Sequence, residues 1–130
     1  MDQSQESLLK IGAVAEQSGV SIDTIRYYER RGLLSPAGRL ESGYRVYRDS
    51  TVTRVRLARR LQALGMTLEE IAASLRAHDE ANATCESERW RLEVVRDRIT
   101  AQLKELTAMQ AELESVLAHC AAGNCELRDQ

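Results

Sequence analysis

The chain has 130 residues, enough for one compact domain or for a small domain with an extended element attached. Apolar residues make up 43% of the sequence, which argues against wholesale disorder, and no apolar run approaches the roughly 18 residues of a membrane span. The first residues, MDQSQES, are polar and acidic, unlike a signal peptide, so we expect a cytoplasmic protein with no membrane partner.

The formal net charge of −2 hides an uneven distribution of charge along the chain. Residues 24–60 carry ten Lys and Arg against three Asp and Glu, whereas residues 77–130 carry six against eleven. All four tyrosines lie in the basic part. A surface that follows a phosphate backbone needs basic and aromatic side chains together, although a solvated basic face can look similar. The charge pattern therefore favours nucleic-acid binding by the N-terminal part.

Two short helices separated by a turn are predicted after a short strand at residues 8–11. The first helix stops at Gly19, and Ser21 is a good N-cap for a second helix from Ile22 to about Arg31, which ends at Gly32. This is a helix-turn-helix pattern, which many small helical domains share.

A small hairpin, or wing, is predicted next, because Pro and Gly residues interrupt helical structure between residues 35 and 48. The stretch GYRVYR alternates as a strand does, with Tyr44 and Val46 on the face opposite Arg45 and Tyr47. Such a wing would place Arg and Tyr side chains beside the backbone of a duplex whose groove holds the second helix.

Two further helices and a linker are expected before residue 85. The third helix is capped by Asp49 or Ser50 and ends at Gly65. The fourth begins at a capping box, Thr67 with Glu70, and runs to about residue 78, where the polar stretch HDEANAT indicates a linker.

A long helix from residue 85 carries a seam of apolar residues in steps of three and four, with no Gly or Pro inside it. The seam consists of Leu92, Val95, Ile99, Gln102, Leu106, Met109, Leu113, Val116 and Cys120. A single helix would expose this stripe, so we expect a homodimer. In an antiparallel pair Gln102, the only polar member apart from the thiol, would lie beside the two-fold axis and could fix the register.

The chain has three cysteines, Cys85, Cys120 and Cys125. An odd number in a reducing compartment argues for metal binding or thiol chemistry rather than a disulfide framework, with plain burial as the alternative. Along one helix Cys85 and Cys120 would be roughly 50 Å apart, but an antiparallel partner would bring them together across the dimer. Three thiolates would suit a soft or borderline ion, and His119 is either a fourth ligand or a solvent-facing residue.

Two strings, IGAVAEQSGVSIDTIRYYERRGLL and SGYRVYRDSTVTRVRLARRLQALGMTLEEIAASL, closely resemble the N-terminal domain of the MerR family of regulators. The resemblance implies a mainly α fold. Residues 8–78 would form a winged helix-turn-helix DNA-binding domain with its connecting helices, residues 85–119 the helix of an antiparallel coiled-coil dimer, and residues 120–130 a metal-binding loop and tail. It also implies a function, in which the dimer binds promoter DNA and distorts it on sensing an inducer, so that RNA polymerase can use it.

Site residues follow from the same resemblance, motif by motif. It implies DNA contacts from the second helix at Arg26, Tyr28 and Arg30, from the wing at Tyr44, Arg45 and Tyr47, and to the backbone from Arg54. Tyr27 stands where an aromatic residue is often part of the packing.

The cysteines resemble those of the family's sensors for divalent ions, which respond to mercury, lead, cadmium or zinc. Those sensors have a cysteine at the start of the dimerisation helix and a pair in the terminal loop, the pattern of Cys85, Cys120 and Cys125. The loop between the last two is shorter than usual, and Glu126 stands where proline is common. Three sulfur ligands favour mercury or lead, and recruitment of His119 or another ligand favours zinc or cadmium.

Two other functions remain open. A thiol-based redox or electrophile sensor would keep the DNA-binding part and need one reactive cysteine. An architectural DNA-bending protein would have no effector. An enzyme is not expected, because neither histidine lies near a recognisable nucleophile or carboxylate pair and no Gly-rich phosphate loop is present.

Overall fold

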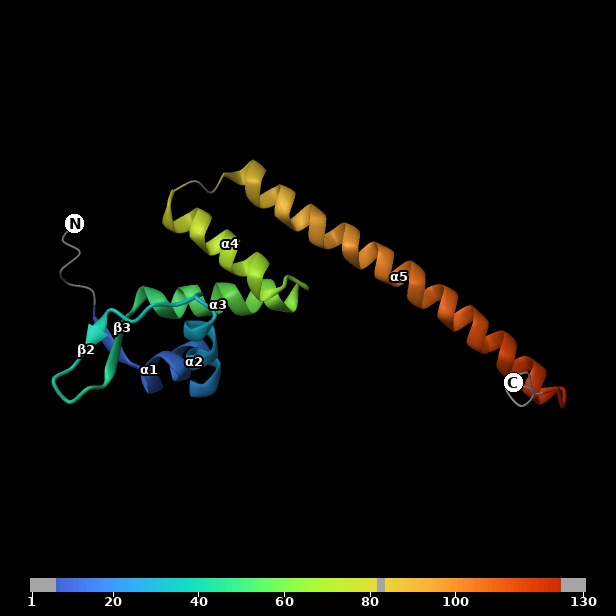
Figure 1. The fold of residues 1–130 in the computed structure, drawn as a ribbon, viewed down its shortest axis with the longest axis horizontal. Helices are drawn as coiled ribbons and strands as arrows, with labels where there is room; N and C mark the ends of the chain where they lie inside the picture. Colours follow the sequence, from blue (N-terminus) through green and yellow to red (C-terminus); the bar gives the residue numbers. More distant parts are fainter. Residues whose placement is uncertain (1–6, 82–83, 125–130) are drawn as a thin grey trace. The chain divides into compact units, whose positions relative to one another are not determined.

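The computed structural model describes residues 7–81 and 84–124 and divides into two units, Met1–Glu88 and Arg89–Gln130. The elements in chain order are β1 (Leu8–Lys10), α1 (Ile11–Ser18), α2 (Ile22–Arg30), β2 (Gly38–Arg39), β3 (Arg45–Arg48), α3 (Ser50–Ala63), α4 (Leu68–Asp79) and α5 (Cys85–Ala121) (Figure 1). The predicted mainly α class is confirmed, as is the small wing beside a helix-turn-helix. No helix in the described ranges is long and apolar enough to span a membrane.

The helix-turn-helix forms where its local signals predict. Ser21 caps α2, since its side-chain oxygen accepts a hydrogen bond from the Thr24 N–H at 3.1 Å. Gly32 ends α2 in the left-handed conformation, with φ of 80°, and its N–H donates to the Glu29 carbonyl while the Leu33 N–H donates to the Tyr28 carbonyl. The two ends fix the length of α2 and return the chain toward the core at Leu33.

The wing is a three-stranded antiparallel sheet in the order β1-β3-β2, with Leu9 opposite Tyr47. The predicted strand is confirmed, but its burial does not follow its two faces, because the neighbours Val46 and Tyr47 are both buried while Tyr44 is 64% exposed. The cause is that β3 is the central strand and contacts both α1 and α3, so both faces are covered at Val46 and Tyr47.

The first unit has a continuous apolar core. Helices α1 and α2 contact each other, and α1 also contacts α3 and the sheet (Figure 1). The fully buried apolar side chains there include Val14, Ile25, Leu33, Tyr47, Val55 and Ile71. Because α2 buries only one side, its other side remains available for binding.

Helices α4 and α5 both begin at reciprocal side-chain caps. The predicted capping box is present, with Thr67 and Glu70 each accepting from the other's backbone N–H. Before α5, Thr84 and Ser87 exchange the same pair of hydrogen bonds, at 3.0 Å each. The predicted linker lies between the two helices, and its Ala81 has a left-handed φ of 56°.

Candidate nucleic-acid interface and cysteine sites

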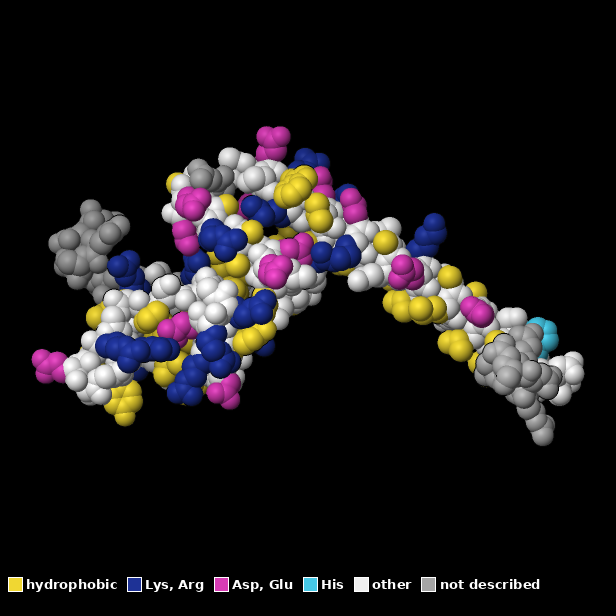
Figure 2. All heavy atoms as spheres, viewed as in Figure 1, with side chains coloured by type: hydrophobic (Ala, Val, Ile, Leu, Met, Phe, Trp, Pro, Cys, Tyr) yellow, Lys and Arg dark blue, Asp and Glu magenta, His cyan; other side chains and the backbone are white. Residues whose placement is uncertain are grey.

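The exposed side of α2 is basic. Arg26 and Arg30 are exposed, and the Arg30 guanidinium carbon lies 6.0 Å from the centroid of the Tyr27 ring. Such a cation–π contact restrains the arginine without consuming its hydrogen-bond donors. Figure 2 shows dark-blue Lys and Arg side chains gathered over α2 and the neighbouring wing.

The exposure of the two tyrosines of α2 is the reverse of what the sequence predicted. Tyr28, expected at the DNA, is 2% exposed, and its hydroxyl donates to Gln62 Oε1 at 2.8 Å. Burial raises the pKa of Tyr28, against an opposing effect of Arg59. Tyr27, expected in the packing, is 40% exposed. The reason is helical periodicity, since residue 28 lies one turn after buried Ile25 and so faces the core.

The wing presents Tyr44 and Arg45 to solvent and keeps Tyr47 inside. The Lys10 ammonium lies 5.6 Å from the centroid of the Tyr44 ring. Tyr47 is fully buried, and its hydroxyl donates to Glu29 Oε2 at 2.8 Å. Burial, followed by that hydrogen bond to a carboxylate, raises the pKa of Tyr47 to about 12, so this side chain is neutral at physiological pH.

Glu29 joins α2 to the wing and was missed by the sequence reasoning. Its Oε2 accepts from Tyr47 and also from Arg45 Nη1 at 3.0 Å. The Glu29 side chain is 13% exposed, so the carboxylate is largely shielded from water. A single acid inside the basic string TIRYYERR was the available signal, because a carboxylate among arginines is usually paired.

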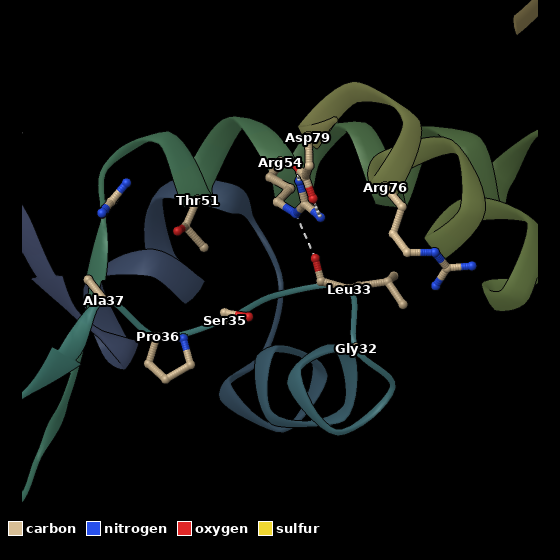
Figure 3. Close-up of a pocket in the computed structure, with 10 residues that line it drawn as sticks. Gly32, Leu33, Ser35, Pro36, Ala37, Thr51, Arg54, Arg76 and Asp79 are labelled. Carbon is tan, nitrogen blue, oxygen red and sulfur yellow. Dashed lines mark hydrogen bonds and ion pairs between the residues drawn. The ribbon is translucent and has the colours of Figure 1, made fainter. Parts of the chain in front are cut away.

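Arg54 lies on α3 at a cavity of about 420 Å³ (Figure 3). Its Nε donates to the Leu33 carbonyl at 2.6 Å, and its Nη1 and Nη2 donate to the two carboxylate oxygens of Asp79 at 2.7 and 3.0 Å. The expected backbone-contact residue is therefore present beside the end of α2, with its guanidinium held on all three nitrogens.

Two of the three cysteines lie at opposite ends of α5. Cys85 is its first residue, Cys120 is next to its last, both are exposed, and neither is in a disulfide. Cys125 lies outside the described residues. Within the described ranges no three His, Cys, Asp or Glu side chains gather as a metal site.

The chain turns directly after Cys120. Gly123 has a φ of 86°, and its N–H donates to the Cys120 carbonyl, while the Asn124 N–H donates to the His119 carbonyl at 2.8 Å. This glycine-dependent cap ends α5 and is the turn that the sequence AAGN predicted. His119 Nδ1 lies 2.9 Å from the Ser115 carbonyl; because a carbonyl only accepts, this nitrogen carries the proton.

Helix α5 exposes a long apolar stripe, visible as yellow side chains along it in Figure 2. The exposed members are Leu92, Ile99, Leu103, Leu106, Met109, Leu113 and Leu117. Leu103 and Leu117 were not in the predicted seam, so the stripe is broader than a strict seam and includes the neighbour of Gln102. An unpartnered stripe of this length favours association with another helix.

Comparisons with known proteins agree with these features. A model described as "MerR HTH family regulatory protein" matches residues 9–78, and one described as "MerR, DNA binding" matches residues 52–116. The chain is 37% identical over 123 residues to a "Heavy metal-dependent transcription regulator 2" of Rhizobium meliloti strain 1021, covering 94% of this chain and 80% of that one. It is 35% identical over 114 residues to a "Mercuric resistance operon regulatory protein" of Pseudomonas fluorescens, covering 88% and 78%.

One solved structure has a similar fold along most of the chain. It is a transcription regulator of Ralstonia metallidurans CH34 in complex with lead(II), with a TM-score of 0.77, 28% identity, and coverage of 85% of this chain and 86% of that one. Relatives of this kind are DNA-binding regulators and not enzymes. The chain therefore belongs to the MerR family of helix-turn-helix transcription regulators.

Proposed function

We propose that the chain works as a homodimer that binds promoter DNA and, when a soft divalent metal ion binds its cysteines, distorts that DNA so that RNA polymerase transcribes it. The candidate ions are mercury, lead, cadmium and zinc. The observation that carries this proposal is the position of Cys85 and Cys120, exposed at opposite ends of the helix that also bears the apolar stripe.

The DNA would meet the exposed cations of α2 and the wing. Arg26 and Arg30 lie on the open side of α2, where a groove-binding helix reads bases, while Tyr44, Arg45 and Arg54 would contact the phosphate backbone. We assign Tyr28 and Tyr47 a positioning role, because both rings are buried and both hydroxyls are bound to other side chains. Phosphate contacts would supply most of the affinity and its salt dependence.

The metal site would be shared between two chains. Cys85 and Cys120 are 35 residues apart, five heptads, so they occupy the same stripe and an antiparallel partner brings Cys85 beside Cys120 of the partner subunit. Cys125 would supply the third thiolate from the residues that follow the turn at Gly123. Three thiolates fit a soft cation, and their charge offsets that of a divalent ion. His119 is a candidate fourth ligand.

The test is a metal titration of the reduced dimer with Hg(II), Pb(II), Cd(II), Zn(II) and Cu(I), following sulfur-to-metal charge-transfer absorption. We expect stoichiometric binding of a divalent ion that is lost in Cys85→Ser and retained in Ala108→Ser, which places the same residue elsewhere on α5. Mixing Cys85→Ser chains with Cys120→Ser chains should restore one site per mixed dimer. Tight Cu(I) binding unaffected by Cys85→Ser would contradict the divalent site.

A redox or electrophile sensor is the second candidate, favoured by the exposure of both described thiols. It predicts that one Cys→Ser change removes the transcriptional response and the other two leave it. A metal site predicts that all three changes remove it. Transcription from the promoter with purified RNA polymerase, with metal ion or oxidant added, separates the two.

A further inference from the structure

A cavity with excess positive charge lies between α3, α4 and the loop that follows α2 (Figure 3). Arg48, Arg54 and Arg76 line it, and Asp79 is the only carboxylate among its lining residues. The hydroxyl side chains of Ser35 and Thr51 complete the polar lining. Guanidinium and hydroxyl donors around a cavity of about 420 Å³ suit an anion with several acceptor oxygens, above all a phosphate group.

One of the three arginines already holds an anion. Asp79 accepts from both terminal nitrogens of Arg54, the paired geometry by which arginine also binds a phosphate. Arg48 and Arg76 form no salt bridge with any residue that the structure describes. The carboxylate of Asp79 therefore occupies the place in this cavity that fits an external anion.

The Arg54–Asp79 pair is placed for exchange. The Asp79 side chain is 54% exposed and that of Arg54 26%, so water screens the pair and its net contribution to stability is small. The third nitrogen of the Arg54 guanidinium, Nε, donates to the Leu33 carbonyl, and this bond fixes the plane of the guanidinium. An incoming anion need only replace Asp79 at Nη1 and Nη2, with Arg54 already oriented.

We infer that Asp79 competes with a DNA backbone phosphate for Arg54, so that binding promoter DNA releases Asp79. This inference rests on the proposed function and adds a regulatory role to the same surface. Arg48 and Arg76 supply the cationic cavity that receives the phosphate, and Leu33 ties the exchange to the end of α2.

Asp79 lies close along the chain to Cys85, one of the proposed metal ligands. Asp79 is the last residue of α4, and Cys85 is the first residue of α5, after a short linker. The ion pair fixes the end of α4 to α3, and a hydrogen bond of 2.8 Å from Ser74 to Glu88 joins α4 to the first turn of α5. If loss of the ion pair alters the position of Cys85 through these contacts, linkage requires that metal binding at Cys85 alter the exchange by the same free energy.

The test compares Asp79→Asn with the wild-type dimer in promoter binding as salt is varied. Asparagine keeps the shape of the side chain and removes the competing charge, so we expect affinity to rise roughly threefold to tenfold, with a steeper salt dependence. Glu41→Gln on the wing makes the same charge change outside the cavity and should give a smaller gain. In an Arg54→Gln background the gain from Asp79→Asn should vanish.

Unchanged or weaker DNA binding by Asp79→Asn, or a gain no larger than that of Glu41→Gln, would overturn the inference and make Asp79 a positioning residue for Arg54. The Arg54 Nε–H resonance in the labelled dimer should move on adding promoter DNA. If inorganic phosphate alone displaces Asp79 at millimolar concentration, free phosphate rather than DNA is the competitor and the inference fails. A wild-type dimer that does not bind the promoter would refute the proposed function itself.

Discussion

The two units of the chain differ in how far they bury their apolar side chains. The first buries residues of α1, α2, β3, α3 and α4 around one core, including Val14, Ile25 and Ile71 at 0% exposure. The described part of the second consists mainly of α5, whose Leu106, Leu113 and Leu117 are 60%, 61% and 65% exposed. The core of the first unit is formed by its own residues, whereas the exposed apolar stripe of α5 favours a partner helix.

We infer from this difference that the proposed metal-sensing step acts on the dimer rather than on either unit alone. The DNA-binding surface rests on a core and on side-chain bonds that one chain makes alone, such as those of Glu29. The two described thiols, Cys85 and Cys120, lie at the ends of α5, which exposes its apolar stripe. We expect the metal ion to act on how the two chains are joined.

The largest expected effect comes from breaking the stripe of α5. Leu106→Asp places a charge in the middle of the exposed apolar stripe. Each chain would lose a Leu side chain that the dimer is expected to bury, which should cost about 3 kcal/mol of dimer stability. The dimer should weaken by at least roughly 100-fold, with loss of helix content and of promoter binding. Analytical ultracentrifugation and circular dichroism measure this. Ala108→Asp, with the same added charge on the opposite side of α5, is the control; equal behaviour of the two variants would argue against this interface.

The sequence predicted well those features that are fixed within a few residues. The ends of α1, α2 and α4 followed from Gly19, Ser21 and the Thr67 capping box, because each cap joins neighbours three to five residues apart. The periodicity of α5 likewise predicted an exposed stripe, since an uninterrupted heptad pattern depends on no tertiary contact.

Features that depend on distant parts of the chain were not predictable in the same way. The bonds from Glu29 to the wing span 16 and 18 residues, and the Arg54–Asp79 pair spans 25. Nothing local indicates which acid meets which arginine, so Glu29 and Asp79 were missed. The burial of Tyr47 depends on helices covering both faces of the central strand, which alternation along one strand cannot reveal.

A smaller effect is expected from breaking the bond between α2 and the wing inside the first unit. Glu29→Ala leaves the buried hydroxyl of Tyr47 without its acceptor, which should lower the free energy of unfolding by about 1–3 kcal/mol. Tyr47→Phe in that background removes the unsatisfied hydroxyl and should restore part of the loss, with a coupling of about 1 kcal/mol. Urea unfolding at pH 7 measures both, and Glu41→Ala is the control. Strictly additive effects of the two substitutions would contradict this link.

The smallest effect concerns the linker between α4 and α5, where exposed Ala81 has a φ of 56°. A left-handed conformation costs an alanine about 1 kcal/mol, and glycine removes that cost although it loses more entropy on folding. Ala81→Gly should therefore raise stability by about 0.5 kcal/mol, whereas Ala77→Gly inside α4 should lower it by about 1 kcal/mol. Thermal unfolding of both variants checks this. Destabilisation by both glycines would contradict a left-handed conformation at Ala81.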